Sequence, residues 1–184
     1  MYPLPKSFYQ QDPLLVAREL LGTVLVRNFG DAAEISGRII ETEAYLSGTD
    51  PASHAYNGLS CRNASLFKSG GHLYIHSMHG HHCMDIVTES QSNPTSVLIR
   101  ALEPLEGIEV MKQHRSQIKL ENLCSGPGKL TQALAIDKEF DGIDITKPTS
   151  PIQVYCDGHT PKKIYQSARI GISKATQFPY RFYL

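Results

Sequence analysis

Apolar and polar positions divide the first half of the chain into one helix and a series of strands. Asp12 and Pro13 precede an apolar run over 14–21, and Gly22 follows it, which is the pattern of a capped helix. Apolar runs and alternating positions predict strands over 23–28, 35–45, 72–78, 83–88 and 96–102. The polar segment 46–71 separates two of these strands, and loops of this length usually carry function.

The second half of the chain predicts two more helices and then short strands. One helix is expected over 104–113, with Pro104 near its start, and another begins at 125–127 and continues to Ala135. Beyond it, prolines separate short apolar runs, which indicates loops and short strands. The order of elements predicts the α+β class: a single mixed domain over 1–184 with a curved, mostly antiparallel sheet and flanking helices.

Composition is that of an ordinary globular chain. Of the 184 residues, 41% are apolar and 20% are charged, which is enough to form one buried core. No run approaches the roughly 20 apolar residues of a membrane span, and the polar start lacks a signal-peptide pattern. We therefore expect a cytoplasmic protein without membrane contact. The four cysteines include no C-x-x-C pair, so we expect reduced thiols rather than a disulfide scaffold or a zinc site.

The formal net charge is zero, but the charge is unevenly distributed along the chain. Residues 1–109 contain 7 Lys and Arg against 12 Asp and Glu, whereas residues 110–184 contain 11 against 6. A basic half can form a surface for phosphates even on a neutral protein. Uneven surface charge without any nucleic-acid partner is the equally simple alternative.

Two carboxylates and one aromatic ring lie on one face of the strand over 35–45. Side chains alternate along a strand, so Glu41, Glu43 and Tyr45 point to the same side. This is either the exposed polar face of an edge strand or the position of a general base beside a pocket. Cleavage of a glycosidic bond requires such a carboxylate to activate water. Periodicity does not choose between Glu41 and Glu43.

Five histidines lie within 72–82, at positions 72, 76, 79, 81 and 82. Such a tract could bind a metal ion, but the spacing is loose and no fixed carboxylate or cysteine partner is evident. Stacking on nucleobases and ordinary surface histidines are the alternatives. We expect no metal and no cofactor.

Two further features could take part in chemistry. Arg100 lies among aliphatic residues in the strand over 96–102, where it must either reach the surface or pair with a carboxylate such as Glu43. The glycine-containing turn at 123–129 ends in Lys129 at a helix start, which suits a phosphate but is also an ordinary helix N-terminus. The turn lacks the full P-loop pattern, so nucleotide triphosphate hydrolysis is not expected.

Eight segments, in chain order, carry a resemblance that extends over nearly the whole sequence: 37–45, 50–54, 62–63, 71–75, 98–104, 123–127, 129–134 and 181–183. Together they resemble the alkyladenine (3-methyladenine) DNA glycosylase family, whose members excise damaged purines. The resemblance implies an α/β domain that binds double-stranded DNA and flips the damaged nucleotide out of the helix. A protein that scans DNA is most simply a monomer, associated with the nucleoid.

The resemblance also implies a role for individual residues. Glu43 matches the general base, Arg100 matches a residue that helps to hold the attacking water, and Ile170 would offer its backbone carbonyl to the same water. Tyr45 and His54 match the pair that stacks on the flipped base. Three residues of the basic half match positions that contact the DNA backbone: Arg115, Lys129 and Lys138.

Three positions differ from the family pattern. His76 stands where a third pocket residue is usually Tyr, and Asp85 stands where the family has an Asn that screens against guanine. His79 occupies the position of the residue that intercalates into DNA. An ionised Asp85 would favour cationic 3-methyl- and 7-methylpurines over neutral hypoxanthine.

No lysine matches a catalytic position, so the resemblance implies hydrolysis without a lyase step. A DNA-lesion binding protein of the same fold with weakened catalysis is the alternative, because of the substitutions at 76, 79 and 85.

Overall fold

The computed structural model describes residues 1–30, 34–78, 80–116 and 119–184. These residues form one antiparallel sheet of nine strands, in the order β1-β7-β2-β3-β6-β5-β4, with β9 beside β3 and β8 beside β9. The strands are β1 (Tyr2–Pro3), β2 (Val24–Asn28), β3 (Glu34–Tyr45), β4 (Leu73–Met78), β5 (His81–Thr88), β6 (Thr95–Glu106), β7 (Ile152–Cys156), β8 (Tyr165–Ser167) and β9 (Arg181–Tyr183). The predicted α+β class is confirmed.

Within the described residues, four short helices accompany the sheet: α1 (Lys6–Tyr9), α2 (Pro13–Glu19), α3 (Ile108–Arg115) and α4 (Pro127–Ala133). Single turns of 3-10 helix lie at Ala64–Phe67, Leu120–Asn122 and Lys138–Phe140. The predicted cap of α2 is confirmed, because Asp12 Oδ1 accepts from the backbone N–H groups of Leu14 at 2.8 Å and Leu15 at 3.3 Å. No helix within the described ranges has the length and apolar content of a membrane span.

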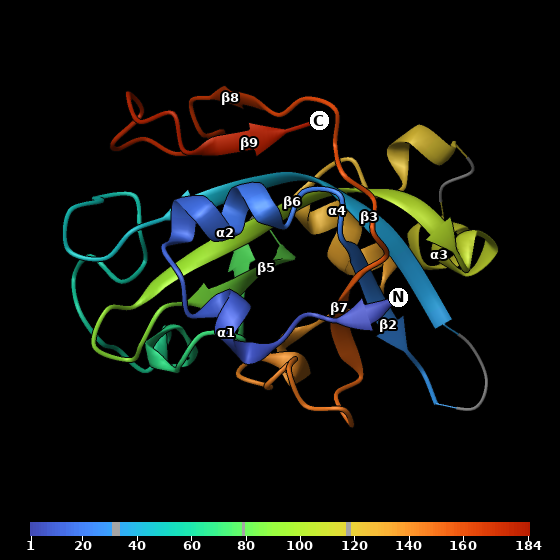
Figure 1. The fold of residues 1–184 in the computed structure, drawn as a ribbon, viewed down its shortest axis with the longest axis horizontal. Coiled ribbons are helices and arrows are strands. Elements are labelled where there is room, and N and C mark those ends of the chain that lie inside the picture. The colour runs from blue at the N-terminus through green and yellow to red at the C-terminus, as the bar shows by residue number, and fades with distance from the viewer. Residues whose placement is uncertain (31–33, 79, 117–118) are drawn as a thin grey trace.

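The long strands β3 and β6 cross the middle of the molecule side by side, and α2 lies against them (Figure 1). Val16 and Ala17 of α2 are fully buried, and the Ala17 carbonyl accepts a 2.7 Å hydrogen bond from Thr42 Oγ1 of β3. The red hairpin of β8 and β9 runs along the outer side of β3 (Figure 1). The strand that carries both carboxylates is therefore central, and the edge-strand interpretation is wrong.

The helix expected over 104–113 begins later than predicted. β6 continues to Glu106 and pairs there with β3, so that Pro104 lies opposite Gly37. Gly107 then adopts a left-handed φ of 71°, and α3 begins at Ile108. Proline lacks a backbone N–H, but it lies beside a register shift of the ladder, where one missing hydrogen bond is tolerated.

β3 changes one of its neighbours half-way along its length. Residues 34–38 pair with β2, whereas residues 41–43 pair with β9, and β6 lies on the other side throughout. At this change the ladder between β3 and β6 is irregular, with register shifts on both sides of Glu41. Ile40 and Arg100 have no directly opposite residue in this ladder. Bulges of this kind bend a strand and redirect its side chains.

Candidate active site

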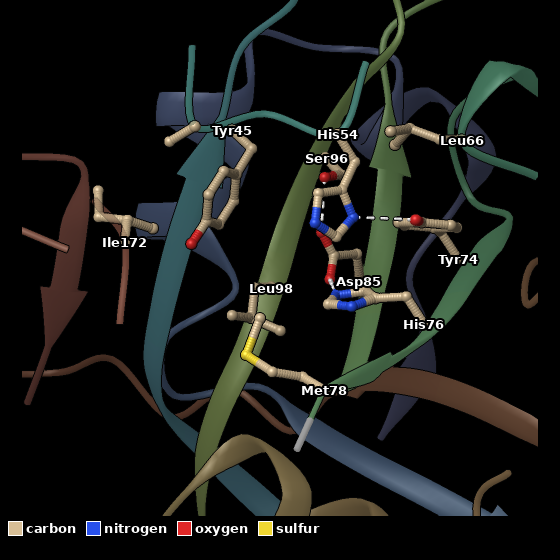
Figure 2. Close-up of a pocket in the computed structure, with 11 residues that line it drawn as sticks. Tyr45, His54, Leu66, Tyr74, His76, Met78, Asp85, Ser96, Leu98 and Ile172 are labelled. Atoms are coloured by element: carbon tan, nitrogen blue, oxygen red, sulfur yellow. Dashed lines mark hydrogen bonds and ion pairs between the residues drawn. The ribbon is translucent and has the colours of Figure 1, made fainter. Parts of the chain in front are cut away.

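A small cavity of about 60 Å³ lies between the second half of β3 and strands β4 to β6. Tyr45 lies on one side of it, and His54, Tyr74 and His76 lie on the other (Figure 2). His54 comes from the long loop over 46–71, so this loop forms part of the cavity wall. The cavity shares four lining residues with a wider cleft of about 740 Å³ that leads towards Lys138.

The aromatic side chains on the far wall hold one another in place. His54 Nδ1 and the Tyr74 hydroxyl are hydrogen-bonded at 2.9 Å, and the ring of His76 stacks on Tyr74 with centroids 5.2 Å apart. The rings of His54 and His76 meet edge to face at 4.6 Å. Burial, together with the neighbouring His76, lowers the pKa of His54, and burial raises the pKa of Tyr74. A neutral imidazole and a neutral phenol therefore face the cavity.

Asp85 brings a carboxylate to the back of the cavity. Its side chain is 7% exposed, and its Oδ2 accepts a 2.7 Å hydrogen bond from Ser96 Oγ. Its Oδ1 accepts no hydrogen bond from any residue that the structure describes, and it lies 3.4 Å from His76 Nε2. A buried carboxylate with an oxygen open to a further donor is a suitable contact for a polar or cationic ligand.

Glu43 lies beside the cavity and is completely buried. Its Oε1 accepts a 2.8 Å hydrogen bond from the backbone N–H of Ile170. Its Oε2 accepts a 2.8 Å hydrogen bond from the Tyr45 hydroxyl and lies 3.3 Å from Arg100 Nη1. The expected pairing of Arg100 with Glu43 is thus present. Arg100 Nε also donates to Glu41 at 2.9 Å, so the arginine is shared by both carboxylates.

Burial raises the pKa of Glu43, although Arg100, the Ile170 N–H and the Tyr45 hydroxyl all favour the charged form. Burial and the nearby Glu43 carboxylate raise the pKa of Tyr45, so its hydroxyl stays protonated and donates. A buried carboxylate with a raised pKa and a fixed hydrogen-bond shell is typical of a general base.

Ile170 is held in place by a second buried ion pair. Arg169 donates to both oxygens of Asp50, at 2.5 and 2.7 Å, and to the Ala44 carbonyl at 2.9 Å. Both charged side chains are almost fully buried, at 0% and 1% exposure, and the guanidinium lies 4.5 Å from the centre of the Tyr45 ring. Arg169 thereby fixes the backbone next to Ile170, whose N–H group binds Glu43.

Residues 7–184 match the sequence model of the family described as methylpurine-DNA glycosylase. The chain belongs to this family.

Relatives over the full length carry the provisional name 3-methyladenine DNA glycosylase. The one from Methanoculleus marisnigri is 41% identical over 98% of this chain and 94% of its own. The one from Chlorobium phaeobacteroides strain BS1 is 42% identical over 100% and 92%, and that from Agrobacterium fabrum is 44% identical over 97% and 87%. The resemblance seen in the sequence is confirmed. Membership of the methylpurine-DNA glycosylase family assigns the chain to DNA repair and implies that its substrate is DNA.

The basic residues expected to contact DNA are not gathered around the cavity. Lys138 lines the wider cleft, where its ammonium donates to the Ile75 carbonyl at 2.6 Å and to Asp141 at 2.8 Å. Arg115 donates to Gln132 of α4 at 3.0 Å, and Lys129 donates to Ser125 at 2.9 Å. Their contact with the DNA backbone remains a prediction.

The histidine tract is dispersed by the fold. His76 enters the cavity, whereas His72 binds the Ser69 carbonyl at 2.7 Å. His81 packs beside Gly128, and His79 lies outside the described residues. Among the residues that the structure describes, no three His, Cys, Asp or Glu side chains are placed to hold a metal ion.

Several residues of the site were not singled out from the sequence. Tyr74 is two positions from His76 on the same strand, so alternation could have placed it on the cavity wall. Asp50 and Arg169 are 119 positions apart, and no local pattern connects them. Ile170 contacts Glu43 through its N–H group, whereas the sequence interpretation concerned its carbonyl.

Proposed function

We propose that this chain is a monofunctional DNA glycosylase that releases alkylated purines, such as 3-methyladenine and 7-methylguanine, by hydrolysis. The observation that carries the proposal is Glu43, a fully buried carboxylate of raised pKa fixed beside an aromatic cavity. The glycosidic bond is hidden in a duplex, so the nucleotide must be flipped out before water can attack it.

The flipped base would stack between Tyr45 and His54, which lie on opposite sides of the cavity (Figure 2). Alkylation at a ring nitrogen makes the purine cationic, and aromatic faces attract cations. The same positive charge makes the base a good leaving group. A cation beside the Asp85 carboxylate gains further stabilisation, whereas neutral hypoxanthine gains less. We infer a preference for cationic methylpurines on this ground.

Glu43 would accept the proton of the attacking water. Each carboxylate oxygen has two lone pairs, and Oε1 accepts only the Ile170 N–H among the described groups, so it can also accept from water. The water oxygen bonds to C1′, the bond from C1′ to the purine nitrogen breaks, and its electron pair leaves with the base. Arg100 would orient the water and balance the charge of Glu43. The ionised carboxylate also stabilises the positive charge that develops on the sugar.

Hydrolysis rather than lyase chemistry is favoured by the lining of the cavity. A lyase needs an amine that forms an imine with the sugar, and none of the described lining residues is a lysine. The proposal is tested by incubating the protein with methylated DNA, identifying the released bases, and treating the reaction with borohydride. We expect free methylpurines, intact abasic strands and no trapped protein–DNA adduct. Tight binding to the lesion without base release would instead indicate a lesion-binding protein.

A further inference from the structure

Glu41 is the second carboxylate of β3, and it binds two arginines. Its Oε1 accepts hydrogen bonds from Arg100 Nε at 2.9 Å and from Arg181 Nε at 2.6 Å. The three side chains are only 12–19% exposed, so these contacts are largely shielded from water. Charge-assisted hydrogen bonds with this shielding restrict side-chain orientation more strongly than surface pairs do.

The sheet explains why the two arginines meet at this residue. Glu41 lies at the irregular point of β3, opposite Ala101 of β6 on one side and Tyr183 of β9 on the other. Arg100 has no directly opposite residue at this point of the ladder. Its long side chain therefore depends on Glu41 and Glu43 for its orientation.

The contacts form a closed series around Glu43. Arg181 Nη1 donates to Ser167 Oγ at 2.9 Å, and its guanidinium lies 4.5 Å from the centre of the Tyr183 ring. Only three positions after Ser167, the Ile170 N–H binds Glu43. The series begins and ends in the segment 167–170, and its members in order are Ser167, Arg181, Glu41, Arg100, Glu43 and Ile170.

We propose that Glu41, anchored by Arg181, is a positioning residue that holds the Arg100 guanidinium against Glu43 in the orientation needed to activate water. With Nε bound by Glu41, Nη1 of Arg100 lies 3.3 Å from Glu43 Oε2. This inference rests on the proposed function, in which Glu43 is the general base.

Glu41 also acts on Glu43 through its charge. Its carboxylate raises the pKa of Glu43, in the direction opposite to Arg100. Among the described residues, further titratable or charged groups beside Glu43 include Tyr45 on β3, Cys83 on β5 and Arg181 on β9. Removing the charge of Glu41 therefore lowers the pKa of Glu43.

The experiment measures single-turnover release of 7-methylguanine against pH for the wild type, Glu41→Gln, Arg181→Gln and Glu43→Gln. We expect Glu41→Gln to lower the rate about 10- to 100-fold, the loss that misplaced catalytic groups cause. The acid limb of its pH–rate profile should move to lower pH. Arg181→Gln should also lower the rate, because Glu41 then loses the arginine that anchors it. DNA affinity should not change. Asp157→Asn is the matched control, because it breaks another arginine–carboxylate pair of β3, with Arg38 at 2.8 Å.

Three outcomes would overturn the inference. The first is a Glu41→Gln rate within about twofold of the wild type while Glu43→Gln is inactive. The second is a Glu41→Gln variant whose rate falls only as much as that of Asp157→Asn and whose pH–rate profile keeps the acid limb of the wild type. The third, decisive if Glu41→Gln does not fold, is an Arg181→Gln profile identical to that of the wild type. If Glu43→Gln releases base as fast as the wild type, the proposed function itself fails.

Discussion

Replacing Asp50 by asparagine removes the carboxylate that neutralises Arg169 in the protein interior. Both side chains are almost fully buried, and the guanidinium donates two hydrogen bonds to Asp50. Losing one partner of a buried ion pair leaves an uncompensated charge and costs about 3–5 kcal/mol. For a chain of this length, 1 kcal/mol corresponds to roughly 2–4 °C, so we expect the Tm to fall by about 6–20 °C.

Urea unfolding at pH 7.5 measures this loss directly. The matched control is Asp157→Asn, whose carboxylate is 27% exposed against 1% for Asp50, and it should cost about 1 kcal/mol or less because water reaches and screens this carboxylate. The double variant Asp50→Asn with Arg169→Met should recover part of the loss, since no charge is then left buried without a partner. A free energy of unfolding for Asp50→Asn within about 1 kcal/mol of the wild-type value, at an unchanged m-value, would refute the reasoning.

Three further predictions concern the cavity and its base. Burial raises the pKa of Glu43, and only the ionised carboxylate can accept a proton from water. As the pH is lowered, the rate of base release should therefore begin to fall at a pH above the usual pKa of a glutamate, and a pH–rate profile measures this. The same raised pKa means that ionisation of Glu43 opposes folding. The protonated group contributes fully to the free energy of unfolding below the pKa that it has in the unfolded chain, and this contribution is lost as the pH rises through its pKa in the folded protein. Glu43→Gln should therefore unfold at higher urea than the wild type at pH 8, with the difference shrinking towards pH 4; equal midpoints at pH 8 would contradict this. Asp85→Asn should lower the ratio of 3-methyladenine to hypoxanthine release, and an unchanged ratio would remove Asp85 from selectivity.

The sequence predicted those parts of the fold that depend on local patterns. Asp12 and Pro13 specified the start of α2, and alternation located the central strands. The helix after Pro104 was placed too early, because pairing with Gly37 extends β6 past the proline and tertiary pairing overrides local preference.

The candidate site was predictable only in part. Alternation placed Glu41, Glu43 and Tyr45 on one face, and resemblance to the family chose Glu43 as the base. The structure gives that choice a physical reason, since Glu43 is fully buried while Glu41 lies in a more exposed arginine cluster. The pair of Asp50 and Arg169 joins segments 119 residues apart, and such contacts leave no periodic signal in one sequence.

The central claim is that Glu43 activates the water that releases the base. The most direct test is single-turnover release of 7-methylguanine from duplex DNA by the wild type and Glu43→Gln, with lesion binding measured in parallel. We predict a rate lower by about 10²- to 10⁴-fold in the variant, the usual contribution of a general base, with lesion affinity retained. Base release by Glu43→Gln at the wild-type rate would contradict the account.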